Sequence, residues 1–143
     1  MRYTNDRQVS LREYQSTEDI EECMKRRLKA LKQRCRSKGW ECDLTVEDMY
    51  TLYTSRHCFY SGVLLAHGKS SQHETPAWNM ATIDRINPDR GYVKGNVVPC
   101  SYEFNLLKGA LEGRALRCTP SQFITGMQVL LTVEREIHTC HTE

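Results

Sequence analysis

The sequence contains no run of about 18 apolar residues, which is the length that a membrane-spanning helix needs. Its first residues, MRYTNDRQVS, also lack the apolar stretch of a secretory signal. We therefore expect no membrane partner and a cytoplasmic location. The seven cysteines are odd in number and follow no signal, which favours reduced thiols over a disulfide framework.

The sequence also lacks a large excess of charge of either sign, because the net charge of the 143 residues is only +2. The distribution is nevertheless uneven, with eight Lys or Arg and no acid between Lys25 and Lys38. Such a run is either a solvated helix face or a surface that follows a nucleic-acid backbone. The chain length allows one domain with one modest core.

Helical patterns dominate the first third of the chain. Ser16 or Thr17 can cap a helix that runs to Ser37 and stops at Gly39. Apolar residues that would face a core recur at helical spacing, namely Ile20, Cys23 or Met24, Leu28, Leu31 and Cys35. The outer face then carries the candidate nucleic-acid contacts, which are Lys25, Arg26, Lys29, Lys32 and Arg36.

A second helix is predicted over residues 45–56, where the spacing of Thr45 and Asp48 suits a capping box. Its expected buried stripe consists of Val46, Met49, Tyr50 and Tyr53. Residues 57–65 are predicted to form a short strand or turn, residues 80–86 a strand, and residues 95–100 a second strand. Helices follow from about Ser101 and from Pro120 to about Ile137. The fold class is thus α+β, with a polar arm over residues 1–15 and one domain over residues 16–143.

The strand–turn–strand–helix unit carries Asp84 on its first strand and Asn105 on its helix. It resembles the ββα-metal site of HNH (His-Me finger) endonucleases over about residues 58–109. The segments KGWECDLTVEDMYTLY, CFYSGVLL and LLKG, together with TPSQFITGM, look like parts of phage-type HNH proteins, which include a branch with Asp-Arg in place of Asp-His. The resemblance implies a ββα-metal core with additional N- and C-terminal helices, in a phage-encoded, metal-dependent endonuclease that hydrolyses DNA.

The resemblance also assigns roles to particular residues. Asp84 and Asn105 would hold one Mg²⁺ or Mn²⁺, because such hard cations prefer oxygen ligands. Asn96 would brace the loop between the strands, and Arg85 and Lys108 would meet phosphates. The alternatives are that Asp84 caps the next turn, that Asn105 is an ordinary polar helix residue, and that Lys108 is a solvated surface lysine. One site per chain cuts one strand, so paired cuts need a homodimer or two binding events.

Arg85 stands where the common motif of the family has the histidine that deprotonates the attacking water. Arginine stays protonated and cannot take that part in the ordinary sense. Either Arg85 clamps the phosphate while water attacks without a strong base, or a base comes from elsewhere, or the site binds metal and DNA without cutting. The candidate bases are His67, His73, His57 and Tyr92.

Two other function classes therefore stay open. One is a nucleic-acid-binding protein on an inactive HNH scaffold, and the other is a phage protein-interaction or inhibitor module. A structural zinc ion is not expected, because Cys58 and Cys100 each lack the second cysteine of a zinc knuckle. We expect these two thiols to be packed close together.

Overall fold

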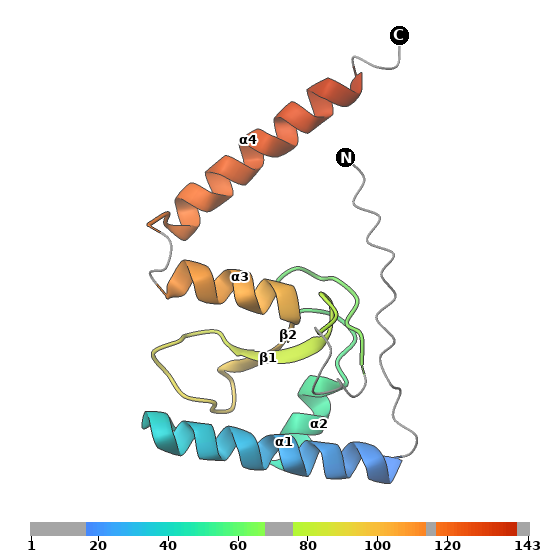
Figure 1. Ribbon diagram of the computed structural model, residues 1–143, viewed down its shortest axis with the longest axis vertical. Coiled ribbons are helices and arrows are strands. Elements are labelled where there is room, and N and C mark those ends of the chain that lie inside the picture. The colour runs from blue at the N-terminus through green and yellow to red at the C-terminus, as the bar shows by residue number, and fades with distance from the viewer. Residues whose placement is uncertain (1–16, 68–75, 114–116, 140–143) are drawn as a thin grey trace. The chain divides into compact units, whose positions relative to one another are not determined.

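The computed structural model describes residues 17–67, 76–113 and 117–139, with the backbone alone described for residues 17, 18 and 134–139. Within these ranges the chain forms helices and one two-stranded antiparallel sheet, which confirms the α+β class. The predicted arm over residues 1–15 lies outside the described residues. The chain divides into two compact units, Met1–Leu106 and Leu107–Glu143, and the first unit contains the sheet (Figure 1).

Helix α1 (Thr17–Lys38) has the predicted bounds to within a residue. It ends at Gly39, whose φ of +68° suits glycine, and the N–H of Trp40 donates to the carbonyl of Cys35 at 2.9 Å. The predicted apolar stripe is confirmed, because its central members are buried in the main core cluster: Cys23, Met24, Leu28, Leu31 and Cys35. Burial of this stripe holds α1 against the rest of the first unit.

Helix α2 (Val46–Tyr53) begins at the predicted capping box. The hydroxyl of Thr45 accepts from the N–H of Asp48 at 3.2 Å, and the carboxylate of Asp48 accepts from the N–H of Thr45 at 2.8 Å. The prediction that Tyr50 is buried is wrong, since 43% of it is exposed while Met49 is 1% exposed. One residue turns an α-helix by about 100°, so Tyr50 points away from the face that Met49 and Tyr53 share.

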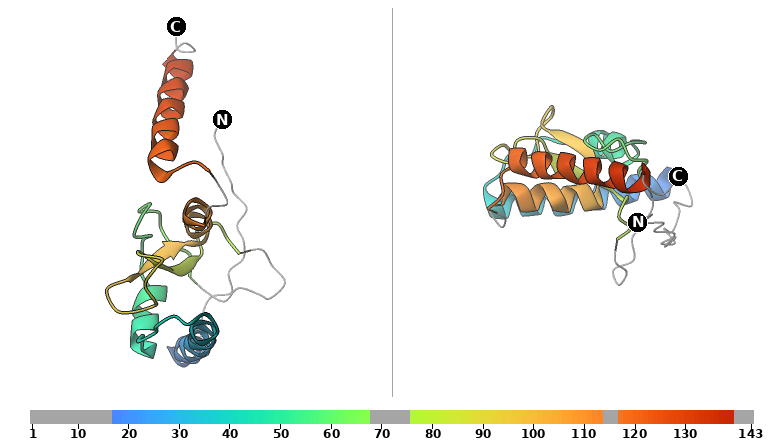
Figure 2. Two further views of the ribbon diagram at one scale, coloured as in Figure 1. Left: turned by 90° about the vertical axis from the view of Figure 1, so that its left-hand side faces the viewer. Right: turned by 90° about the horizontal axis from the view of Figure 1, so that it is seen from above.

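Strands β1 (Ala81–Arg85) and β2 (Val97–Ser101) pair in antiparallel register, with Asp84 opposite Val98. Helices α1 and α2 lie on the same side of this sheet (Figure 1), and Figure 2 shows the two helices beside each other there. Side chains of β1 alternate between faces. Ile83 therefore packs into the core cluster of α1 and α2, whereas Asp84 is turned to the other face.

Residues 57–65 form a turn rather than a regular strand, closed by an isolated bridge between His57 and Leu64. Helix α3 (Tyr102–Glu112) starts directly after β2, as predicted, and the N–H of Tyr102 donates to the carbonyl of Met80 at 2.9 Å. The boundary between the two units falls within α3.

The second unit contains helix α4 (Pro120–Thr139), which was predicted at these bounds to within two residues. Thr119 and Gln122 exchange hydrogen bonds of 2.9 and 3.2 Å at its start, in the manner of a capping box. Within the described part of the chain, no helix has both the length and the apolar content needed to cross a membrane.

Candidate functional site

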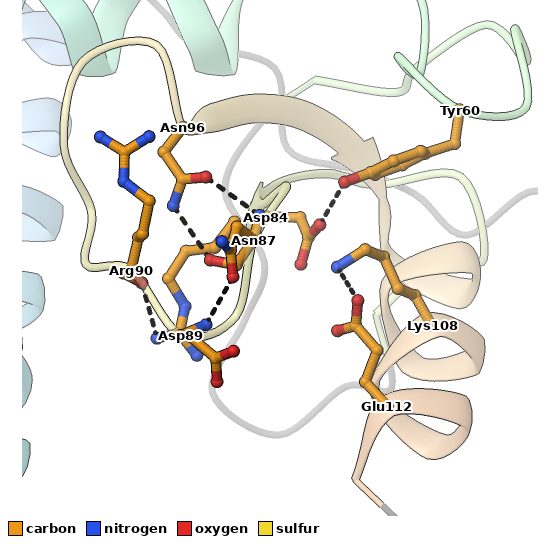
Figure 3. A network of polar contacts seen from close by, with 9 residues as sticks. Tyr60, Asp84, Asn87, Asp89, Arg90, Asn96, Lys108 and Glu112 are labelled. Carbon is orange, nitrogen blue, oxygen red and sulfur yellow. Dashed lines mark hydrogen bonds and ion pairs between the residues drawn. The ribbon is translucent and has the colours of Figure 1, made fainter.

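Asp84 lies near the end of β1 and has a phenol as one of its partners. The hydroxyl of Tyr60 donates to Oδ2 of Asp84 at 2.7 Å (Figure 3). The ring of Tyr60 is itself stacked on Phe104 of α3, with centroids 5.1 Å apart and planes at 19°. A carboxylate has about four lone-pair positions, so Asp84 can keep this bond and still contact a cation. Tyr60 therefore fixes the direction in which the carboxylate points.

Asn105 lies in the first turns of α3, and its side chain is bonded back to β1. Its amide nitrogen donates to the hydroxyl of Thr82 at 3.1 Å and to the carbonyl of Ile83 at 3.2 Å. Both amide hydrogens are thus used on the strand that carries Asp84. The amide oxygen points away from them and is left to meet a donor or a cation. A carboxylate oxygen and an amide oxygen are ligand types that suit Mg²⁺ or Mn²⁺.

Asn96 is the polar centre of the loop that connects the two strands (residues 86–96). Only 2% of the residue is exposed. Its side-chain oxygen accepts from the N–H of Asn87 at 2.9 Å, while its amide nitrogen donates to the carbonyls of Asn87 at 3.1 Å and Gly91 at 3.0 Å (Figure 3). Three hydrogen bonds from one buried side chain therefore hold the two limbs of the connecting loop together.

The connecting loop is also fixed from outside, by the segment that follows α1. The N–H of Tyr92 donates to the carbonyl of Glu41 at 2.9 Å, and the N–H of Lys94 donates to the carboxylate of Asp43 at 2.8 Å. Gly91 makes this approach feasible, because a Cβ atom there would collide with the backbone of Glu41. The shape of the loop thus depends on residues about 50 positions earlier in the sequence.

Arg85 belongs to the opposite face of β1 from Asp84. Its guanidinium carbon lies 3.9 Å from the centre of the Trp40 ring and 5.2 Å from that of Tyr92. One of its terminal nitrogens donates to the carbonyl of Arg90 at 3.2 Å. The side chain consequently joins the core beside α1 to the connecting loop. In this arrangement Arg85 is turned toward the protein rather than toward the carboxylate of Asp84.

The alternative bases have different surroundings. The Nε2 atom of His67 lies 2.6 Å from the carbonyl of Ser55, so this nitrogen carries a hydrogen and donates. Tyr92 is buried in the main core cluster, and its hydroxyl accepts from Arg34 at 3.0 Å. His57 pairs with Leu64 through its backbone. His73 lies outside the described residues.

The five predicted nucleic-acid contacts on α1 are all exposed: Lys25, Arg26, Lys29, Lys32 and Arg36. Lys25 pairs with Glu21 at 2.8 Å, an exposed helical pair of the kind that contributes little stability. Lys108 belongs to the second unit, where it pairs with Glu112 at 2.7 Å (Figure 3). Two other arginines of α1, Arg27 and Arg34, turn toward the sheet instead.

Cys58 and Cys100 pack in one buried cluster, at 2% and 0% exposure, as predicted for packed thiols. Burial alone would raise the pKa of the Cys58 thiol. Hydrogen bonds from the side chain and backbone of Ser61, and from the backbones of Ser101 and Tyr60, outweigh this and lower the pKa to about 6. These hydrogen bonds therefore favour the thiolate form of Cys58.

Three residues near the site were missed by the sequence analysis, namely Tyr60, Arg27 and Arg34. Tyr60 carries no local signal, because its partner Asp84 is 24 residues away. The two arginines could have been found on a helical wheel, since Arg27 lies four residues before the buried Leu31 and Arg34 lies three residues after it. Comparison of the chain with protein-family models, curated proteins and solved structures gives no match.

Proposed function

We propose that the chain is a metal-dependent endonuclease that hydrolyses DNA through an HNH-type ββα site. The observation that carries this proposal is the anchoring of Asn105. Its amide is bonded to the strand residue that precedes Asp84, so the two oxygen donors come from directly contacting elements. Asp84 and Asn105 would hold one Mg²⁺ or Mn²⁺, which supplies charge neutralisation on the phosphate and on the leaving oxygen.

The other residues act by positioning. Tyr60 orients the Asp84 carboxylate through its 2.7 Å hydrogen bond. Asn96 keeps the connecting loop in one shape, which preserves the approach of a DNA strand to the end of β1. Arg85 braces the same loop through the Arg90 carbonyl instead of acting as a base. A phosphate contact by Lys108 stays a prediction from the family resemblance.

A plasmid-cleavage assay with Mg²⁺, Mn²⁺ or EDTA tests this function. Asp84→Ala and Asn105→Ala remove proposed metal ligands and should lower the cleavage rate at least about 100-fold, because a bound cation stabilises the transition state by several kcal/mol. Asp89→Ala is the matched control, since that exposed carboxylate lies on the connecting loop and should leave the rate nearly unchanged. Equal rates for all three variants, or cleavage in EDTA, would show that this site is not responsible.

A second candidate function is DNA binding without cleavage. The stacking of Arg85 on Trp40 favours it, because the position that usually supplies the base is occupied by a side chain held in the protein. Retained DNA binding with no cleavage in any metal would establish this function. Cleavage gained by Arg85→His would then show that the base alone is missing.

A further inference from the structure

The first unit contains a cleft of about 630 Å³, which lies between α1, α2, β1 and the start of α3. This volume is within the range of about 300–1,000 Å³ that is typical of ligand sites. We call it the arginine cleft, after the two cations that line it. The polar residues of its wall that matter here are Arg27, Arg34, Tyr53, Tyr92, Tyr102 and Asn105.

The arginine cleft is suited to an anion. Arg27 and Arg34 line it, and no Asp or Glu is among the described residues of its wall. The two arginines are seven residues apart in α1, which places them on one helix face with about 10 Å between their positions along the axis. Two positive charges on one wall of a cleft attract phosphate groups.

Both guanidinium groups are held in place before any ligand arrives. The guanidinium carbon of Arg27 lies 4.3 Å from the centre of the Tyr53 ring. Arg34 donates to the hydroxyl of Tyr92 at 3.0 Å and lies over the same ring at 5.4 Å. A flexible lysine loses side-chain conformational entropy when it binds a phosphate. An arginine stacked on a tyrosine is already ordered, so it loses less.

Asn105 belongs both to the wall of the arginine cleft and to the proposed metal site. Asn105 therefore connects the wall of the cleft to the proposed metal site. The separation of about 10 Å along α1 exceeds the axial rise of 3.4 Å per nucleotide of one DNA strand, so the two arginines can reach different phosphates. We propose that the arginine cleft binds the phosphate backbone of the DNA strand beside the cleaved bond, with Arg27 and Arg34 each on one phosphate.

This inference rests on the proposed endonuclease function and changes where the DNA lies. The outward residues of α1 were expected to contact the backbone, whereas the geometry assigns that part to Arg27 and Arg34. The outward lysines supply at most a general attraction at low salt. The two assignments differ in measurable ways, because removing a phosphate contact reduces the salt dependence of binding.

The experiment measures binding of a fluorescent DNA duplex by anisotropy, in EDTA so that nothing is cut, at several salt concentrations. The variant Arg27→Gln/Arg34→Gln should weaken binding about tenfold per arginine and lower the slope of log K against log salt by about 2. The matched control is Lys29→Gln/Lys32→Gln, which removes the same charge from the exposed face of the same helix and should lower the slope much less than the arginine pair does.

A third variant, Arg27→Lys/Arg34→Lys, keeps both charges and should retain most of the wild-type slope. It separates loss of charge from a folding defect, which far-ultraviolet circular dichroism and thermal unfolding of each variant also check. The inference is wrong if the glutamine pair binds with wild-type slope, or if the Lys29/Lys32 control loses as much. Salt-independent or absent binding by the wild type would overturn it as well.

The two proposals can fail separately. If metal-supported cleavage occurs and the Arg27/Arg34 variant binds normally, the endonuclease function stands and the cleft inference falls. If no metal supports cleavage but binding still depends on Arg27 and Arg34, the cleft binds DNA and the chemistry is absent. If the Lys29→Gln/Lys32→Gln variant loses binding while the Arg27→Gln/Arg34→Gln variant binds normally, the DNA lies on the outer face of α1.

Discussion

Replacing Asn96 by alanine would test whether one side chain holds the connecting loop in shape. The change removes three hydrogen bonds and leaves the N–H and carbonyl of Asn87 and the carbonyl of Gly91 without this partner. A typical hydrogen bond contributes about 1 kcal/mol net, and an unsatisfied buried group costs about 1–3 kcal/mol. Asn87 is exposed, so water can replace part of the loss there. We therefore expect the free energy of unfolding to fall by about 2–4 kcal/mol.

Urea denaturation followed by far-ultraviolet circular dichroism measures this loss, provided that the slope m is unchanged. Asn79→Ala is the control, because within the described part of the chain the side chain of Asn79 donates one hydrogen bond, to the carbonyl of Leu64 at 3.1 Å. It should cost about 1 kcal/mol or less. Asn96→Asp keeps the acceptor, but it places a carboxylate beside two carbonyl oxygens and should cost at least as much as alanine. A loss for Asn96→Ala no larger than that for Asn79→Ala would refute the bracing argument.

Three further predictions concern other contacts of the first unit. Gly91→Ala should lower the free energy of unfolding by about 1–3 kcal/mol, since its Cβ meets backbone, whereas Gly126→Ala, with open space around it in α4, should raise it by up to about 1 kcal/mol; urea denaturation compares the two. The lowered pKa of Cys58 predicts that the stability of the reduced protein rises with pH between about 6 and 8.5, by up to about 3 kcal/mol. This stabilisation is fully present above the pKa of Cys58 in the unfolded chain and is lost as pH falls through its pKa in the folded protein. A pH series of denaturation curves should therefore show no such rise in stability for Cys58→Ser. Tyr60→Phe keeps the ring but removes the hydroxyl that orients Asp84, so cleavage should need about tenfold more Mg²⁺; an unchanged metal titration would contradict that role.

The helices could be predicted from the sequence because their signals are local. The stripe from Cys23 to Cys35 repeats at helical spacing, and the capping box at Thr45 needs only four residues. Tyr50 shows the limit of such patterns. A tyrosine suits either a core or a surface, and only the direction of neighbouring elements decides which face of α2 is covered.

Residues of the candidate site could be predicted only at positions that belong to a recognised sequence motif. Asp84, Asn96 and Asn105 were predicted through a resemblance, which did not indicate their hydrogen-bond partners. The phenol that holds Asp84 comes from 24 residues earlier, and the ring that holds Arg85 from 45 residues earlier. Contacts between distant segments depend on how the chain folds back, which spacing along the sequence does not encode.

The anchoring of the connecting loop limits how this protein can be cut, extended or recombined. A fragment that starts at residue 76 would keep both strands but lose Trp40, Glu41 and Asp43, and with them every outside anchor described for the loop. The strand–loop–strand–helix unit therefore cannot be transferred alone to another protein with its loop structure intact. A graft into another scaffold has to bring the stretch after α1 with it. Insertions between α1 and α2 should be tolerated far less well than an exposed connection would suggest.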